Sequence, residues 1–247
     1  MTITIIGGGI IGLTTAFELT ERGENVHLID AETSDYGTAA DGTALYPAAS
    51  HYAGGMLAPI AEVQFQQDAL FPLMTASADA YPSLMGRLSR ATDLPTGYDT
   101  TGTLIIAADR ADAEHLQRTR AYYRDMNRPA DPVTPTQART LEPLLAPRIA
   151  GAVSIPSDHQ LHPRLMRRAL KDALTRRGVT FSTERVTDPD AGDIICAGLG
   201  ATLHGNYPLR PVYGDILRLR TPRPILKHVV RGYVNSRPVY LIPRPDG

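Results

Sequence analysis

A glycine-rich turn between a strand and a helix stands almost at the first residue, and it constrains the fold more than any other feature. Residues 3–6 form a short β-branched strand pattern, and glycines follow at positions 7, 9 and 12. Apolar residues then recur at helical spacing, and a second strand ends on Asp30, eighteen residues after Gly12. This combination is the dinucleotide-binding fingerprint. An ordinary glycine-rich turn accounts for one such glycine, not for three at this spacing together with the acid.

Each position of the fingerprint has a physical task. Gly7 allows the tight turn, Gly9 lets the backbone approach a pyrophosphate, and Gly12 lets the helix pack close on the strand. The helix begins with Ile10 and Ile11. Its N-terminus offers unpaired backbone N–H groups and the positive end of the helix dipole to phosphates. The carboxylate of Asp30 is placed to accept hydrogen bonds from a ribose diol.

Composition narrows the class of protein. The chain has 247 residues, a formal net charge of −1 and one cysteine, Cys196. The balanced charge gives no electrostatic reason to expect nucleic acid or an anionic membrane. No stretch approaches the roughly 18 apolar residues of a membrane span, and no signal peptide is evident. A single cysteine fits a reducing compartment, so we expect a cytoplasmic protein.

The order of elements predicts two interleaved domains of an α/β protein. A Pro-started helix from Pro163, a strand over 179–181 and a buried strand before Cys196 continue the nucleotide-type pattern. We therefore expect a Rossmann-like domain over 1–60 and 150–205, and a mixed-sheet α+β domain over 61–149 and 206–247.

Some local patterns lead to further expectations. Residues 31–49 are small and polar and predict a loop, while 66–91 predict helical pieces broken at Pro72 and Pro82. Strands are expected over 216–219 and 239–242. Turn residues follow the second of these strands, and a hairpin partner that should come next is absent from the sequence.

Short motifs spread along the chain point to a known family. They are ASHYAGGMLAP (49–59), GYDTTGTL (97–104), LEP (141–143), DHQLHP (158–163), CAG (196–198), RPVYGD (210–215) and PVYLIPR (238–244). Together with the glycine turn, and in this order, they resemble the D-amino-acid oxidase superfamily. Within it, the similarity is greatest to the glycine oxidases of thiamine biosynthesis.

The resemblance implies an FAD flavoprotein that oxidises glycine or another small amino acid to a keto acid, ammonia and hydrogen peroxide. Its partners would be the amino acid and O₂, without nucleic acid or membrane; a homo-oligomer is left open. It implies that Met56 and Tyr240 face the substrate and that Tyr240 hydrogen-bonds its carboxylate. FAD would be bound by the fingerprint positions and Asp30 together with Ser50, Ala53, Gly54, Gly55, Met56, Val186, Ala197 and Gly198.

The chain departs from this family in three ways. The segment between Asp30 and Ser50 is longer than usual, and Tyr213 replaces a lysine often found in its motif. The family's sequence also continues past Gly247, where we expect the arginine that pairs with the substrate carboxylate. On this interpretation the 247-residue chain by itself is expected to be inactive.

Simpler interpretations of the same residues stay open. Without the resemblance, Tyr240 is a half-buried strand tyrosine, Met56 fills a core and Cys196 is a small buried hydrophobe. His159 and His162 precede a helix without further metal ligands, which favours a loop role over a metal site. The competing functions are a non-catalytic FAD-binding fragment and an NAD(P)-dependent dehydrogenase. The loop after Asp30 argues against the dehydrogenase, in which a further β-α-β unit would follow.

Overall fold

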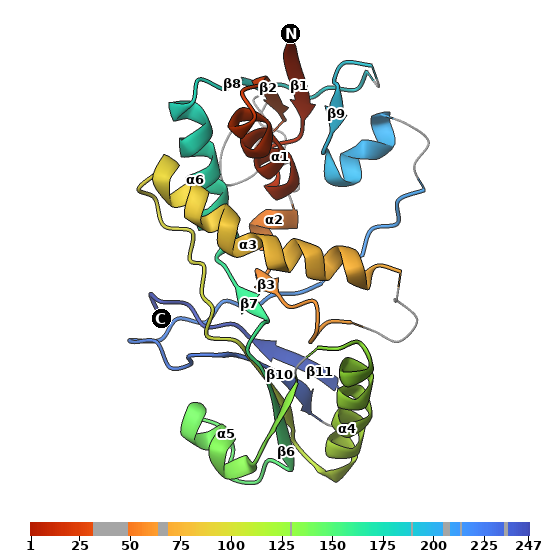
Figure 1. Cartoon of the computed structure of the whole chain (residues 1–247), viewed down its shortest axis with the longest axis vertical. Helices are drawn as coiled ribbons and strands as arrows, with labels where there is room; N and C mark the ends of the chain where they lie inside the picture. The colour runs from red at the N-terminus through yellow and green to blue at the C-terminus, as the bar shows by residue number, and fades with distance from the viewer. Residues whose placement is uncertain are drawn as a thin grey trace. The chain divides into compact units, whose positions relative to one another are not determined.

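The computed structural model describes residues 1–31, 49–63, 69–128, 130–188, 190–204, 208–212, 214–234 and 237–247. The chain folds into two compact units (Figure 1). Unit 1 comprises 1–54, 85–96 and 162–217, and unit 2 comprises 55–84, 97–161 and 218–247. The predicted loop over 31–49 and the departure at Tyr213 fall outside the described residues, except for Ala31 and Ala49.

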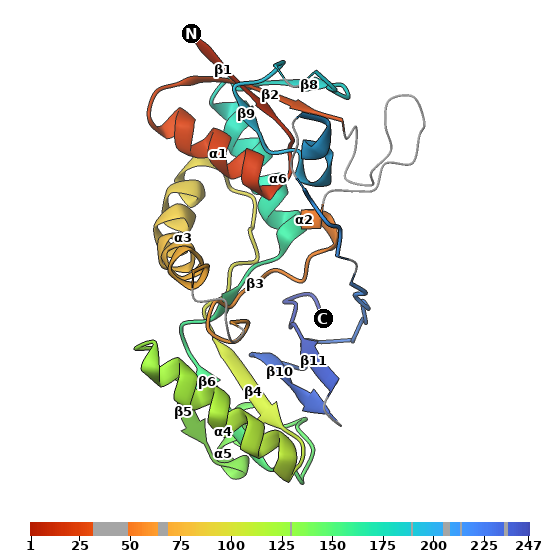
Figure 2. The same ribbon diagram turned by 90° about the vertical axis from the view of Figure 1, so that its right-hand side faces the viewer.

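Unit 1 is built on a four-stranded parallel sheet. The strands are β1 (Thr2–Ile6), β2 (Asn25–Asp30), β8 (Thr180–Thr183) and β9 (Ile194–Ile195), in the order β8-β2-β1-β9. Helices α1 (Ile10–Glu21) and α6 (Pro163–Arg176) pack against each other on one face of this sheet (Figure 2). The short α2 (Ala49–Tyr52) and a 3-10 helix over Gly198–His204 complete the unit. Its parallel strands and shared helix face are Rossmann-like, as the sequence predicted.

The core of unit 1 follows from the helical periodicity of α6. Met166, Ala169, Leu170, Ala173 and Leu174 recur at helical spacing and are all fully buried. Proline occupies the first helical position of α6, and Gly178 takes a φ of +79° just beyond its end. The predicted start of the helix at Pro163 is therefore confirmed.

Unit 2 is built on a five-stranded mixed sheet. Its strands are β4 (Thr103–Ala107), β5 (Asp131–Val133), β6 (Gly151–Ile155), β10 (Val229–Val234) and β11 (Arg237–Leu241), in the order β11-β10-β4-β6-β5. Only β10 and β4 run parallel. A separate two-stranded ladder pairs β3 (Met56–Leu57) with β7 (His159–Gln160), setting Met56 opposite Gln160.

Helices cover the sheet of unit 2. Helix α4 (Arg110–Asp125) packs on β4 and β6, and the short α5 (Pro135–Leu141) packs on β6. Alternate residues of β4 then enter two separate cores: Ile105 joins Leu116 and Tyr123 of α4, while Leu104 joins Ala138 of α5. A strand buried on both faces has a continuous apolar sequence, which is what TLIIA shows.

The two helix breaks predicted at Pro72 and Pro82 are wrong. Helix α3 (Phe71–Ala91) runs without interruption through both prolines. Pro72 lies in the first turn, where a backbone N–H has no partner within the helix in any case. Pro82 lies inside the helix and is exposed, so the helix tolerates the loss of one hydrogen bond there.

Two strand expectations also need correction. Residues 216–219 form no strand with any described segment, and Leu217 and Leu219 stay 86% and 80% exposed. An alternating sequence becomes a strand only where a neighbour accepts its hydrogen bonds. The strand near Tyr240 does have a partner, because β10, which precedes it, pairs antiparallel with β11.

The unit boundaries differ from the predicted domain boundaries. The chain leaves unit 1 after Gly54 rather than after residue 60, and it returns at His162 rather than at 150. Residues 85–96, expected in the second domain, belong to unit 1, and the boundary between Leu84 and Met85 falls within the unbroken helix α3. Among the described helices, none combines the length and hydropathy needed to cross a bilayer.

The Leu-Glu-Pro motif has a clear role in unit 2. Glu142 is fully buried, and its Oε1 accepts hydrogen bonds from the backbone N–H groups of Lys227 and His228 at 2.8 and 2.6 Å. The same oxygen lies 2.8 Å from His228 Nδ1. Glu142 therefore fixes the chain immediately before β10.

Replacing this glutamate should destabilise unit 2. Glu142→Ala leaves two N–H groups without their acceptor and is expected to lower the free energy of unfolding by about 3 kcal/mol. Glu114→Ala is the matched control, because Glu114 pairs with Arg110 only on the exposed face of α4 and should change stability by less than about 0.5 kcal/mol. Denaturant unfolding measures both, and equal stabilities would contradict this role for Glu142.

Candidate cofactor-binding and active site

The glycine turn is closed by contacts from both neighbouring strands. Gly7 has a φ of +109°, and its N–H donates to Ile29 O at 2.8 Å. A Cβ on Gly7 would lie 2.3 Å from the carbonyl oxygen of Cys196, which follows β9. Only glycine fits here, both for its backbone conformation and for the space available.

Gly12 shows the close packing expected of it. A Cβ there would lie 1.9 Å from Gly7 O and 3.3 Å from the Cβ of Cys196. Helix α1 therefore rests directly on the turn. This contact sets the position of the helix N-terminus relative to the sheet.

Gly8 has a role that the fingerprint does not specify. A Cβ on Gly8 would lie 2.1 Å from Oδ2 of Asp30 and 2.9 Å from its Cγ. The absence of a side chain at Gly8 therefore makes room for the acid that ends β2. In the sequence, the one signal of this role is the run of three consecutive glycines.

The N-terminus of α1 suits an anionic ligand. Its N-cap residue is Gly9, which has no side chain to cap the helix. The hydroxyl of Ser50, on α2, accepts a hydrogen bond from Ile10 N at 3.2 Å, and Ile11 is 69% exposed. An open helix end beside a glycine turn fits a pyrophosphate, because its N–H groups and dipole favour negative charge.

The acid of the fingerprint lies beside a small cavity. Asp30 and Gly8 line a space of about 60 Å³, and the other lining residues are Leu13, Leu28, Arg167, Arg168, Lys171, Phe181, Ser182 and Thr183. Arg167 of α6 donates to Gly8 O at 3.3 Å, so it also braces the turn. No sequence pattern indicates this role, because an arginine on an amphipathic helix usually faces solvent.

The remaining predicted cofactor residues divide between the units. Ala197 and Gly198 follow Cys196 at the end of β9, beside the turn. Val186 is half-buried and follows Glu184, whose N–H donates to Asp30 O at 3.1 Å. Ala53 and Gly54 belong to unit 1, whereas Gly55 and Met56 belong to unit 2.

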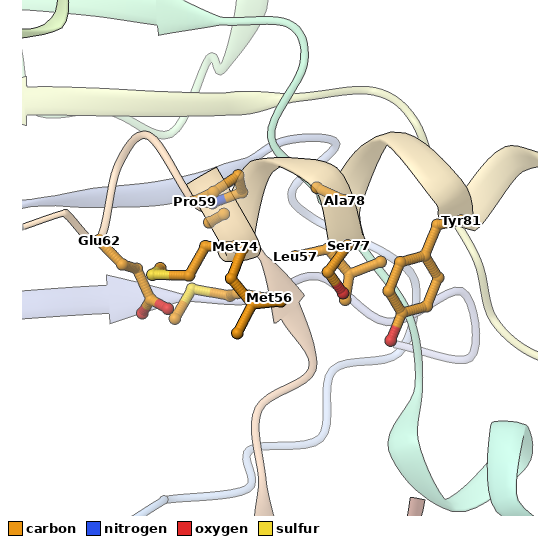
Figure 3. A pocket seen from close by; sticks show the side chains of 10 residues that line it. Met56, Leu57, Pro59, Glu62, Met74, Ser77, Ala78 and Tyr81 are labelled. Atoms are coloured by element: carbon orange, nitrogen blue, oxygen red, sulfur yellow. The ribbon is translucent and has the colours of Figure 1, made fainter. Parts of the chain in front are cut away.

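Unit 2 contains a pocket at Met56. Its volume is about 300 Å³, and it is lined by Met56, Leu57, Ala58, Pro59, Glu62, Leu73, Met74, Ser77, Ala78 and Tyr81. Figure 3 shows the thioether side chains of Met56 and Met74 close together, with Glu62 at one end and Tyr81 at the other. The pocket wall is mostly apolar and has one carboxylate.

Tyr240 is connected to this pocket through two charged residues. Glu62 Oε1 accepts from Arg231 Nη1 at 2.7 Å, and the Arg231 guanidinium lies over the Tyr240 ring, 5.9 Å from its centroid. Arg231 and Tyr240 face each other across β10 and β11. Tyr240 remains 44% exposed. The sequence did not predict the link through Glu62 and Arg231.

Cys196, His159 and His162 show no feature of a reactive or metal site. Burial raises the pKa of the Cys196 thiol, so it stays protonated at neutral pH. His159 Nδ1 lies 2.9 Å from the Tyr98 hydroxyl, and burial lowers its pKa. His162 is the N-cap residue of α6, although its side chain makes no capping hydrogen bond. Within the described residues, no group of three or more His, Cys, Asp or Glu side chains could hold a metal ion.

The fold and the glycine turn define a flavin- or nicotinamide-type dinucleotide protein, and comparison with known families distinguishes the two. The model of the DAO family, FAD dependent oxidoreductase, matches residues 2–247, and the chain belongs to this family. FAD is therefore the cofactor, as predicted, and the NAD(P) alternative is wrong.

Individual relatives are similar over most of the chain. A glycine oxidase from Geobacillus kaustophilus is 28% identical over 92% of this chain, which spans 64% of that protein's length. A putative thiamine biosynthesis oxidoreductase from Rhizobium etli is 29% identical over 99% of the chain and 68% of its own length. The crystal structure of the Geobacillus glycine oxidase superposes with a TM-score of 0.77 at 25% identity, covering 99% of this chain and 68% of that one.

The geometry at Gly8 leads to a test of the cofactor site. Gly8→Ala should displace the Asp30 carboxylate, and Asp30→Ala should remove the charge-assisted hydrogen bonds that we predict it makes to the ribose, worth roughly 1.5–3 kcal/mol. Both variants are expected to bind FAD about tenfold more weakly or worse.

FAD titration of the purified apoprotein measures this loss of affinity. Gly86→Ala is the control, because a Cβ on Gly86 of α3 meets open space. Unchanged FAD affinity in both Gly8→Ala and Asp30→Ala would mean that the acid at the end of β2 does not hold the cofactor.

Proposed function

We propose that this protein catalyses the FAD-dependent oxidation of glycine or another small amino acid to the keto acid, ammonia and hydrogen peroxide. The observation that carries this proposal is similarity to a glycine oxidase over nearly the whole chain, in sequence and in fold. The names of further relatives support a role in thiamine biosynthesis.

The two units have separate tasks in this reaction. Unit 1 binds FAD through the turn at Gly7–Gly12, the Ser50 hydroxyl and Asp30, with Val186, Ala197 and Gly198 along the cofactor. Unit 2 contributes the two side chains that face the substrate, Met56 and Tyr240. The chain segment from Ala53 to Met56, which passes from one unit to the other, follows the flavin with its backbone.

The chemistry requires little covalent participation by the protein. When bound, FAD would supply the acceptor for a hydride that leaves the substrate α-carbon, and O₂ would be the final electron acceptor. Tyr240 donates its hydroxyl to the substrate carboxylate, which orients the α-carbon. Met56 offers an apolar surface that keeps water away from the reacting carbon.

We also propose that the protein acts in the cytoplasm, since a single cysteine fits a reducing compartment.

The first experiment tests cofactor and activity together. Purified full-length protein should show the visible absorption of oxidised flavin and should release peroxide when glycine or sarcosine is added, in an amount equal to the keto acid formed. A flavin spectrum without turnover of either amine would favour the non-catalytic FAD-binding alternative over the oxidase.

Tyr240→Phe tests the substrate contact. A hydroxyl that binds the carboxylate equally in the ground state and the transition state affects mainly KM. We expect KM for glycine to rise about tenfold, with kcat nearly constant. A tenfold change corresponds to about 1.4 kcal/mol, close to the free energy of one hydrogen bond to a charged group. Tyr233→Phe, on the neighbouring strand β10, is the control. A fall in kcat at constant KM would show that Tyr240 has another task.

A further inference from the structure

The buried carboxylate of Asp158 takes no part in the site described above. Asp158 belongs to the motif DHQLHP and lies just after β6, yet it has no assigned role. Its side chain is completely buried. Burying a carboxylate is costly unless hydrogen bonds compensate, so the partners of Asp158 indicate its function.

Those partners are backbone groups of the pocket wall. Oδ2 of Asp158 accepts from Ala61 N at 2.7 Å, and Oδ1 accepts from Ile60 N at 3.3 Å. The two N–H groups belong to a single helical turn, which is closed by Glu62 N donating to Ala58 O at 3.0 Å. At such a turn the first N–H groups have no partner within the turn, and Asp158 provides it from a distant segment of the chain.

The turn leads directly to the residues that face the pocket. Ala58, Pro59 and Glu62 line it together with Met56. The Glu62 carboxylate is joined to Arg231, and the Arg231 guanidinium lies over the ring of Tyr240. A shift of the turn therefore moves Glu62, and through it the guanidinium that packs on Tyr240.

We propose that Asp158 is a positioning residue for substrate binding: its carboxylate holds the turn from Ala58 to Glu62 and thereby fixes Glu62, Arg231 and Tyr240. This inference rests on the proposed function, in which Tyr240 binds the substrate carboxylate. It adds a residue that touches neither cofactor nor substrate but determines how well the substrate is held.

The electrostatic surroundings make this contact dependent on pH. Burial raises the pKa of Asp158 to about 7; the N–H bonds from Ala61 and Ile60 and the charge of Arg231 oppose the increase, and Glu62 adds to it. Tyr123 of α4 also faces Asp158, and burial keeps its hydroxyl protonated by raising its pKa. Above pH 7 Asp158 is ionised and accepts both hydrogen bonds fully. Below pH 7 it gains a proton and holds the turn less firmly.

The raised pKa has the opposite consequence for stability. A carboxyl whose pKa is higher in the folded chain than in the unfolded chain favours folding when protonated, and this contribution is lost as the pH rises through about 7. At pH 8 the ionised group therefore lowers stability while it holds the turn. Substrate binding and stability therefore change in opposite directions with pH, and this distinguishes a positioning residue from a purely structural one.

The experiment compares wild type and Asp158→Asn, both as full-length protein loaded with FAD. For Asp158→Asn at pH 8 we expect KM for glycine to rise about tenfold with kcat nearly constant, and the melting temperature not to fall. In the wild type KM should rise as the pH is lowered from 8 to 6, towards the value of the variant. The variant should lack this dependence.

Thr103→Val is the matched control. The Thr103 hydroxyl donates to the main-chain oxygen of Asp158 at 3.2 Å, so this variant disturbs the same buried region without touching the carboxylate. It should lower the melting temperature and leave KM and its pH dependence as in the wild type.

Hydrogen exchange tests the contact without any turnover. The amides of Ile60 and Ala61 should exchange at least tenfold faster in Asp158→Asn than in the wild type, at pH 8 and after correction for intrinsic rates. Failure of the wild type to oxidise either amine would refute the proposed function and with it the positioning role. Unchanged exchange in the variant, or faster exchange with an unchanged KM, would overturn the inference about Asp158 alone.

Discussion

The close approach of three backbone segments at Gly7 is the contact on which unit 1 depends. The Cys196 carbonyl oxygen, just after β9, lies where a Cβ on Gly7 would stand, and the Gly7 carbonyl oxygen lies where a Cβ on Gly12, in the first turn of α1, would stand. Because β9 must lie beside β1 for this contact to exist, the turn fixes both the strand order and the N-terminus of the helix. The open helix end, the Ser50 hydroxyl and Asp30 are then held in one place by backbone contacts, to which the Arg167 side chain adds a hydrogen bond to Gly8 O.

Unit 2 shows a different way of fixing a site, in which buried carboxylates bind backbone N–H groups. Glu142 holds the start of β10, and Asp158 holds the turn that forms the pocket wall. Both come from motifs that the family resemblance contained without a stated role. In a low-dielectric interior such a bond is strong, and its loss leaves unpaired polar groups, so these positions constrain loops that have little packing of their own.

Most of the features that could not be predicted from the sequence depend on pairing between segments that are distant in the chain. The three glycines, the helix and the acid at Asp30 specify local conformation and are predictable because each depends on residues close to it in the chain. The unbroken α3, the absent strand over 216–219 and the β10–β11 hairpin depend on hydrogen-bond partners that a local pattern does not identify. Family membership helped here, since motifs such as DHQLHP marked positions whose contacts lie far away in the chain.

The sequence by itself therefore determined the dinucleotide turn, the class of cofactor and the two types of sheet. The period of the apolar residues and the spacing of the glycines follow directly from the backbone conformation, so these features can be recognised without a structure. Only the tertiary structure decided that Gly8 makes room for Asp30, that Arg167 braces the turn, and that Asp158 is linked to Tyr240 through Glu62 and Arg231. Each of these contacts joins residues far apart in the chain, and their proximity follows from strand order and packing rather than from any local preference of the residues themselves.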